Sequence, residues 1–410
     1  MMRILFVSEG FQEKSIIAQP WRYTYEIANQ LVKQQHEVAI ATDSPHTSTR
    51  KETVIRNVSA YILPRTRLLP ALSLRIDPCQ LRSLVEEFSP DVIYWDGDAL
   101  IGNYVRRLKD IDIPTAVHIS TNLYSFKDST RALIQEFQPH EYPFLTYLFA
   151  TSSPLVRPLV CPLNQKKIDL ITVPNLAIKR KLIASGLLES KIKAIPTPFC
   201  RDEVFPDENF RDPDRTREKI GLNNEDFIVT YYGPSDTYRG TDTLLHAMAK
   251  LKRKLPSLKL LMLLRQGYER EDKSLMKLMS RSMLGEDVKL TRGLLEREEL
   301  TRFLQTSNAI ALPFKFLKNE PSIAILEAMS MGKPLITTTV SGLTELIGNN
   351  RGLLIEPGNA NELAKEIYYL AKNPEEAEAL GRRARSYISK FPDWSKLAKH
   401  IVALFEQVLK

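Results

Sequence analysis

Three consecutive stretches near the amino terminus decide the fold of this chain: Arg3–Ser8 (RILFVS), Trp21–Gln34 (WRYTYEIANQLVKQ) and Glu37–Thr42 (EVAIAT). The first and the third are short apolar runs, which are typical of parallel strands buried between helices. The second places Tyr23 and Ile27 on one face of a helix. Strand, helix and strand in this order predict a β-α-β unit with a right-handed connection.

The alternation of strands and helices continues along the chain. In the first half, further strands are predicted at Asp91–Tyr94, Thr115–Ile119, Asp169–Val173 and Ile192–Ile195. In the second half, they are predicted at Phe227–Tyr232, Leu258–Leu264, Val288–Leu290, Ala309–Leu312 and Pro334–Thr337. Helical segments separate most of these strands, and this rhythm indicates doubly wound parallel sheets.

The rhythm breaks at Phe199–Arg217, which is rich in Asp, Arg and Pro and lacks apolar periodicity. We therefore predict an α/β protein with two Rossmann-like parallel-sheet domains, over residues 1–198 and 218–393, joined by a linker over residues 199–217. Ligands of open α/β sheets bind beyond the carboxyl ends of the strands. If the two sheets face each other, the functional residues should lie in the cleft between them.

Composition narrows the range of functions. The 410 residues carry a net charge of +8, which suits an anionic small molecule or an anionic membrane surface. A nucleic-acid partner is not expected, because that needs clustered basic residues with stacking aromatic residues. The 3 cysteines form no C-x-x-C pair, which indicates a reducing compartment. No run reaches the roughly 18 apolar residues of a membrane-spanning helix. We expect a cytoplasmic protein, with peripheral contact at the inner membrane face left open.

The most informative stretch for function is Asn319–Thr337 (NEPSIAILEAMSMGKPLIT). Pro321 suits the first turn of a helix, because its missing N–H is not needed there. The N–H groups of Ser322 and Ile323 would then be free at the positive end of the helix, where a phosphate can bind. Glu327 follows on the same helix, and its carboxylate can accept hydrogen bonds from both hydroxyls of a ribose. The alternative is a solvated helix residue, but the apolar neighbours of Glu327 favour a site.

Several ordered motifs resemble the retaining, GT-B-fold glycosyltransferases of family 4, also called glycosyl transferases group 1. The family's acidic residue, its second Glu and its A-M-A-x-G-K-P run correspond to Glu320 and to Glu327–Pro334 (EAMSMGKP). Other matching segments are Tyr231–Ala249 (YYGPSDTYRGTDTLLHAMA), Leu258–Glu271 (LKLLMLLRQGYERE), Ser341–Glu345 (SGLTE) and Gly352–Pro357 (GLLIEP). The N-terminal half matches in rhythm and only loosely in motifs.

This resemblance implies a GT-B fold whose C-terminal segment, Trp394–Lys410, crosses back as a helix to the N-terminal domain. It implies transfer of a hexose-type sugar from a nucleoside-diphosphate sugar to an acceptor hydroxyl, with retention of configuration and without a metal or other cofactor. Asp96 and Asp98 have the spacing of a metal-binding D-x-D motif, but loop carboxylates that cap a helix are the simpler interpretation. The expected setting is the synthesis of a cell-surface glycan, a glycolipid or a polysaccharide.

The resemblance also assigns roles in donor binding. Glu327 would hold the ribose, and the start of the helix at Pro321–Ile323 would bind the diphosphate. The family usually has its first acidic residue eight positions before its second. Asn319 occupies that place and Glu320 is seven positions before Glu327, so either Asn319 or Glu320 would position the donor sugar. Arg239 stands where the family has a phosphate-binding Lys.

Two further departures concern the arginines and the acceptor side. The family's G-R turn reads Gly233-Pro234, and Arg265 replaces a family glycine, so Arg265 could supply the missing charge or form a surface salt bridge. His118 matches a family histidine that contacts the reacting sugar or the acceptor; the alternative is a core histidine with satisfied hydrogen bonds.

The second functional hypothesis is a non-catalytic, GT-B-like binding or scaffold subunit of a glycan-assembly complex. The missing G-R arginine motivates it, as does Ala18–Trp21 (AQPW), which stands where the family has a Gly-Gly loop. Basic clusters that would suit a lipid-linked or phosphorylated acceptor, or solvated helix faces, lie at residues 106–109, 166–167 and 179–181.

Overall fold

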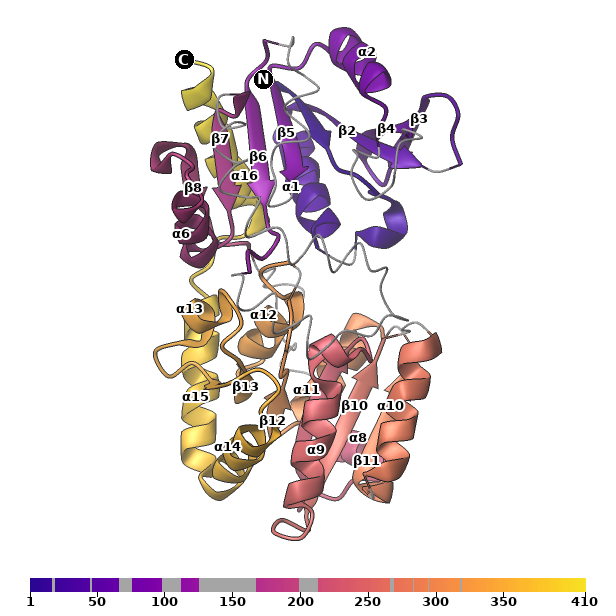
Figure 1. Ribbon diagram of the computed structural model, residues 1–410, viewed down its shortest axis with the longest axis vertical. Coiled ribbons are helices and arrows are strands. Elements are labelled where there is room, and N and C mark those ends of the chain that lie inside the picture. Colours follow the sequence, from indigo (N-terminus) through magenta and orange to yellow (C-terminus); the bar gives the residue numbers. More distant parts are fainter. Residues whose placement is uncertain are drawn as a thin grey trace. The chain divides into compact units, whose positions relative to one another are not determined.

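The computed structural model describes residues 1–16, 19–44, 46–65, 76–97, 112–124, 167–198, 213–265, 269–282, 284–293, 295–317 and 319–410 (Figure 1). The chain divides into two compact units. Unit 1 contains Met1–Pro198, Lys318–Glu320 and Pro392–Lys410, and unit 2 contains Phe199–Leu317 and Pro321–Phe391. Among the residues described, no helix combines the length and the apolar character needed to cross a membrane.

Unit 1 is built on an eight-stranded sheet in the order β3-β4-β2-β1-β5-β6-β7-β8. Its strands are β1 (Arg3–Val7), β2 (Glu37–Ser44), β3 (Lys51–Ile55), β4 (Val58–Pro64), β5 (Val92–Gly97), β6 (Thr115–Ile119), β7 (Leu170–Val173) and β8 (Ile192–Ala194). Neighbouring strands are parallel except for β3 and β4, which form an antiparallel hairpin. The expectation of a wholly parallel sheet was wrong at this edge.

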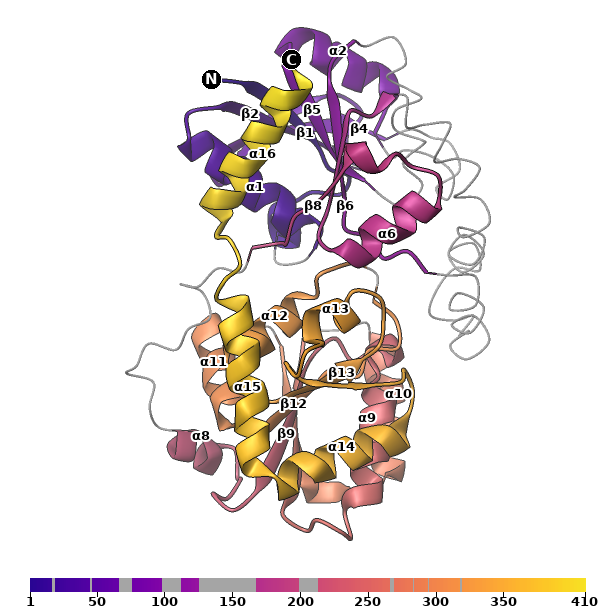
Figure 2. The same ribbon diagram turned by 90° about the vertical axis from the view of Figure 1, so that its left-hand side faces the viewer.

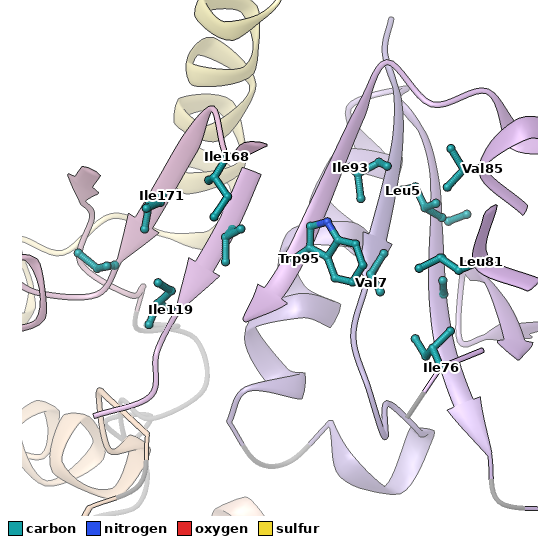
Figure 3. Close-up of a cluster of buried hydrophobic side chains, with 14 of the residues drawn as sticks. Leu5, Val7, Ile76, Leu81, Val85, Ile93, Trp95, Ile119, Ile168 and Ile171 are labelled. Carbon is teal, nitrogen blue, oxygen red and sulfur yellow. The ribbon is translucent and has the colours of Figure 1, made fainter. Parts of the chain in front are cut away.

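Helices cover both faces of the unit 1 sheet. Helix α1 (Trp21–Lys33) and helix α16 (Trp394–Val408) lie side by side on one face (Figure 2). Helix α2 (Pro78–Phe88) and helix α6 (Leu176–Ala184) pack on the other. Figure 3 shows that second face, where Trp95 of β5 lies beside Val7 of β1 in a core of buried side chains. The C-terminal segment therefore joins unit 1, as the resemblance implied.

Unit 2 is built on a parallel sheet of six strands in the order β11-β10-β9-β12-β13-β14. The strands are β9 (Phe227–Gly233), β10 (Leu258–Leu264), β11 (Val288–Arg292), β12 (Ala309–Ala311), β13 (Leu335–Thr338) and β14 (Leu353–Ile355). The helices are α8 (Pro213–Lys219), α9 (Thr241–Leu251), α10 (Glu269–Arg281), α11 (Arg297–Thr306), α12 (Ile323–Ser330), α13 (Leu343–Ile347), α14 (Ala360–Lys372) and α15 (Pro374–Ile388).

The strand order of unit 2 locates its candidate site. From β9 the chain moves outward to β10 and β11, and then returns to the other side of β9 as β12. The strand order thus reverses between β9 and β12, and ligands of open α/β sheets bind at the carboxyl ends of the strands at such a point. The loops that follow β9 and β12 are therefore the first place to look for function.

These sheets confirm the predicted α/β fold with two Rossmann-like sheets. The end of the expected linker was wrong, because helix α8 begins at Pro213 and contacts α11. The rest of that linker, residues 199–212, lies outside the described residues. Elements that the sequence did not predict are the β3–β4 hairpin, α8, α13, β14 and α15.

Helices α12 and α15 approach each other through two glycines. A Cβ atom built on Gly381 of α15 would lie 1.9 Å from the carbonyl oxygen of Gly332, which follows α12 with a φ of +67°. A distance below 3 Å between these atoms is sterically impossible without a shift of the backbone. Gly381 is therefore required by packing, although glycine lowers helix propensity.

We predict that Gly381→Ala destabilises unit 2 by about 1–3 kcal/mol, the usual penalty for overpacking a core. Helix propensity alone would favour alanine by roughly 1 kcal/mol, so the sign of the change in unfolding free energy shows whether packing or propensity dominates. Urea unfolding measures it, with Ser386→Ala on the exposed side of the same helix as the control. A Gly381→Ala protein more stable than the parent would contradict the assigned contact.

Candidate functional site

The turn after β9 carries Arg239 at the switch point of unit 2. The chain leaves β9 at Gly233, whose φ of +138° suits glycine, and forms a short 3-10 helix, η5 (Thr237–Arg239), before α9. Asp236 accepts a hydrogen bond from the backbone N–H of Arg239 at 2.9 Å. Its other carboxylate oxygen lies 4.0 Å from Nε of the Arg239 side chain. Burial raises the pKa of the Asp236 carboxyl, while the nearby guanidinium opposes that shift.

The loop after β12 packs against this turn and is hydrogen-bonded to it. The guanidinium carbon of Arg239 lies 5.2 Å from the centre of the Phe314 ring, which is buried. The carbonyl of Tyr238 accepts hydrogen bonds from the N–H groups of Lys315 and Phe316, at 2.8 Å and 3.1 Å. The two loops are thereby joined along their backbones.

Gly240 explains why glycine follows Arg239. Its φ is +76°, and a Cβ atom there would lie 1.9 Å from the carbonyl oxygen of Pro313. Both the left-handed backbone and the close approach exclude any residue with a side chain. Arg239 therefore directly precedes the glycine whose contact with Pro313 fixes the position of the turn.

Helix α12 begins at Ile323, two residues after Pro321, where the sequence placed its first turn. Ser322 is the N-cap and Ile323 is the first helical residue, so the placement of Pro321 in the first turn was wrong. The Ser322 backbone is extended, with φ −67° and ψ 122°, and in the described part of the chain no side chain caps this helix end. Ile323 is half-buried, so the first turn keeps exposed surface. N–H groups at such a turn are suited to an anion.

Tyr232 connects the end of β9 with this helix end. Its hydroxyl, at the end of β9, donates a hydrogen bond to the carbonyl of Ala324 in the first turn of α12. Burial raises the pKa of Tyr232 well above its ordinary value, and the neighbouring charge of Glu327 raises it further, while Arg265 acts in the opposite direction. The charges of Glu327 and Arg265 therefore both act on one buried hydroxyl, in opposite directions.

The backbone of Arg265 lies beside the end of β9. Its N–H donates to the carbonyl of Gly233 at 3.0 Å, immediately before Pro234, where the resembling family has its arginine. Across the described ranges, no carboxylate forms an ion pair with its guanidinium, in contrast to the surface salt bridge considered as the alternative. Whether Arg265 supplies the charge that is missing at Pro234 stays a prediction.

In unit 1, His118 belongs to a buried polar network. Its Nδ1 lies 3.0 Å from the Thr172 hydroxyl, and its ring stacks on Tyr23 with centroids 3.7 Å apart. The Tyr94 hydroxyl continues the network, 2.7 Å from Thr172 and 3.1 Å from the Tyr23 hydroxyl. The imidazole is 3% exposed, and burial lowers its pKa to about 3. This arrangement matches the alternative, a core histidine, and a contact with substrate stays a prediction.

Asn319 and Glu320 are hydrogen-bonded within unit 1. Asn319 forms an antiparallel backbone bridge with Thr121, just beyond β6, and its side chain donates to the carbonyl of Gln19 at 3.2 Å. Glu320 is buried, and its carboxylate accepts a hydrogen bond from the Asn175 side chain at the start of α6. The positioning of a donor sugar by either residue stays a prediction.

Other candidate residues have simpler roles or lie outside the described residues. Asp96 accepts a hydrogen bond from Ser8 at 3.1 Å, while Asp98 and Ala18 are not among the residues described. The basic cluster at residues 106–109, and Lys166, also fall outside them. Lys179 pairs with Glu189 at 3.0 Å, as expected of a solvated helix face.

Lys333 of the G-K-P motif stabilises the fold. Its ammonium donates to the carbonyls of Gln305 and Ser307 at 2.7 Å and 2.8 Å, at the C-terminal end of α11. Free carbonyls at such an end favour a cation. Burial and the nearby Arg217 lower the Lys333 pKa to about 8.

The sequence reasoning missed three residues of the site: Tyr232, Asp236 and Phe314. Tyr232 and Asp236 flank the Gly233-Pro234 turn, so their place at the end of β9 was a usable signal. Phe314 reaches Arg239 only through the pairing of β9 with β12, which adjacency in sequence does not indicate.

Two family models match this chain. The model described as glycosyl transferases group 1 covers residues 212–387, and the glycosyl transferase 4-like domain covers residues 20–198. The chain therefore belongs to the group 1 and 4-like glycosyltransferases, the family that its motifs resemble.

Individual relatives are distant. The chain is 24% identical over 333 residues to the sulfoquinovosyl transferase SQD2 of Arabidopsis thaliana, covering 79% of this chain and 58% of that protein. It is 25% identical over 181 residues to a trehalose synthase of Pyrococcus horikoshii, covering 43% of each. The chain spans about half the length of the curated relatives it matches.

Solved structures share the complete architecture. Sucrose-phosphate synthase from Thermosynechococcus elongatus aligns with a TM-score of 0.76 at 17% identity, covering 100% of this chain and 99% of that one. HepE from Anabaena, solved in complex with UDP-glucose, aligns with a TM-score of 0.72 at 16% identity, covering 99% and 100%. At this identity the likeness is one of fold, and it confirms the GT-B architecture.

The neutral imidazole of His118 should make stability depend on pH. The folded-state pKa of about 3 lies below the ordinary 6.5, so between these values the unfolded chain binds a proton that the folded chain does not. Stability should therefore fall as pH decreases below 6.5, by about 1.4 kcal/mol per pH unit from this residue. His118→Asn keeps a polar group near the Nδ1 position and removes the titration.

Urea unfolding of both proteins at pH 7.5, 6.5 and 5.5 tests this expectation. Between pH 6.5 and 5.5 the wild-type protein should lose more stability than His118→Asn. Other groups titrate alike in both proteins, so their contribution cancels when the two losses are subtracted. Equal pH dependence of the two proteins would show that His118 is not held neutral.

Proposed function

We propose that this chain is a retaining, metal-independent glycosyltransferase that moves a hexose-type sugar from a nucleoside-diphosphate sugar to an acceptor hydroxyl. The observation that carries the proposal is the hydrogen bond by which Tyr232, at the end of β9, reaches the first turn of α12, together with the opposing electrostatic effects of Glu327 and Arg265 on that hydroxyl. A carboxylate suited to a ribose and a cation suited to a diphosphate thus both act on one hydroxyl that is bonded to the first turn of a helix, where an anion can bind. The UDP-glucose complex of HepE supports this donor class.

The proposed chemistry needs stabilisation of a leaving diphosphate. The acceptor oxygen forms a bond to the anomeric carbon as the bond between that carbon and the diphosphate oxygen breaks. The electron pair of the broken bond goes to the diphosphate oxygen, and the proton of the acceptor hydroxyl goes to the released diphosphate. Arg239, Arg265 and the free N–H groups of α12 would stabilise the developing charge, which is the task that a metal ion performs in other enzymes. The family membership of the chain supports retention of configuration.

The acceptor side is proposed at the level of chemical class. Asn319 or Glu320 would position the donor sugar, and His118, held neutral, could serve only as an uncharged hydrogen-bonding group. The acceptor would be a glycan or a lipid-linked molecule with a free hydroxyl, used in the synthesis of a cell-surface glycan, glycolipid or polysaccharide.

We predict that Glu327→Ala lowers the affinity for a nucleoside diphosphate by about tenfold to a hundredfold, because the ribose loses hydrogen bonds to a charged group. Isothermal titration calorimetry with the uridine, guanosine and adenosine diphosphates measures the effect. Glu298→Ala is the control, since this glutamate is exposed on α11. Unchanged affinity in Glu327→Ala would refute the assigned role.

The second candidate function is a non-catalytic subunit of a glycan-assembly complex. The same titrations distinguish it from the enzyme. It is favoured by the engagement of Glu320 with Asn175, which occupies a carboxylate expected to face the donor. A subunit of this kind would bind none of the three nucleoside diphosphates. Binding combined with transfer of sugar to water or to an added acceptor would exclude it.

A further inference from the structure

Asp236 is out of place in a site for a diphosphate. It follows Gly233-Pro234 at the switch point of unit 2, three residues before Arg239, and its carboxylate is largely buried. A negative charge there repels an anionic ligand, and burial of a carboxylate is unfavourable unless a partner compensates. Its presence therefore needs a physical reason.

The contacts of Asp236 point to Arg239 at both carboxylate oxygens. One oxygen accepts the backbone N–H of Arg239 at 2.9 Å, and the other lies 4.0 Å from the side-chain Nε. Thr241 supports the same turn, because its hydroxyl donates to the carbonyls of Ser235 and Asp236 at 3.1 Å and 3.3 Å. One carboxylate thus binds the backbone of Arg239 by a hydrogen bond and lies within electrostatic reach of its side chain.

Phe314 fixes the other side of the guanidinium. Its buried ring lies beneath the guanidinium at 5.2 Å, within the range of a cation–π contact. An aromatic face offers no hydrogen-bond acceptor in the plane of the guanidinium, so it supports the group without occupying its donors. In the described part of the chain, the Nη groups of Arg239 have no hydrogen-bond partner.

We infer that Asp236 is a positioning residue that acts through Arg239: with Phe314 as the floor, it holds the guanidinium on its Nε side and leaves the two Nη groups for the diphosphate. This inference rests on the proposed function for its ligand. The pair of Nη donors matches two phosphate oxygens. Asp236 itself touches no substrate.

The simplest alternative is that Asp236 only caps η5. A cap would contribute to stability whether or not Arg239 carries its side chain. A positioning residue would affect ligand binding only while that side chain is present. A double-mutant cycle distinguishes the two, because it isolates the coupling between the two residues.

The experiment measures affinity for uridine, guanosine and adenosine diphosphates by calorimetry in the wild-type protein, Asp236→Ala, Arg239→Ala and the double variant. Asp236→Ala should weaken binding by about fivefold to tenfold, the net effect of about one hydrogen bond, because Asp236 acts only through Arg239. In the Arg239→Ala background, the same change should alter affinity less than about twofold. An equal loss in both backgrounds would overturn the inference.

Two further variants sharpen the result. Asp236→Asn keeps an acceptor for the N–H of Arg239 but removes the charge that faces Nε, so its affinity should lie between those of the wild-type protein and Asp236→Ala. Asp287→Ala removes an acid at the opposite, amino-terminal edge of the sheet and should leave affinity within about twofold. Equal losses in Asp236→Asn and Asp236→Ala would contradict positioning through the backbone contact.

Failure of the proposed function is recognised separately. If the wild-type protein binds none of the nucleoside diphosphates, that function fails, and the anchoring of Arg239 is read from the ligand-free protein. The Arg239 Nε–H signal in a ¹⁵N-edited NMR spectrum, assigned with Arg239→Lys, should shift and broaden in Asp236→Ala. An unchanged signal would overturn the inference whatever the outcome of the titrations.

Discussion

The candidate site depends on one close contact, between Gly240 and the carbonyl oxygen of Pro313. Only a residue without a side chain fits there, and its φ of +76° independently selects glycine. The contact joins the turn after β9 to the loop after β12 at the point where the strand order reverses. Arg239 immediately precedes this glycine and Phe314 immediately follows this proline, so the same contact brings the guanidinium over the aromatic ring.

Buried polar groups serve the fold as often as they serve function. His118 lies at a strand end in a family motif, yet it completes a hydrogen-bonded network with Thr172 and Tyr94 beneath helices α1 and α16. Lys333 likewise completes the carbonyl end of α11. Both satisfy the requirement that polar atoms removed from water find partners. Motif residues in this chain therefore divide into those that hold the backbone and those that can contact a ligand.

The sequence predicted most strands and helices because apolar periodicity reports burial directly. It missed the β3–β4 hairpin, whose turn uses Arg56 with a φ of +60° where glycine would be the usual signal. It also placed Pro321 inside α12, since proline suits both the first turn and the residues before it. Glu327, Arg239 and Arg265 could be nominated from motif positions, whereas Phe314 could not, because its contact with Arg239 joins two loops that are far apart in sequence.

By itself, the sequence determined the two Rossmann-like sheets, their division along the chain and the residue types that could bind a nucleoside diphosphate. These properties follow from local patterns of burial and from ordered motifs. Only the tertiary structure decided which charges act together, because the pairing of β9 with β12 brings separate loops to one switch point. Likewise, burial under two helices, and no local pattern, determined that His118 is neutral.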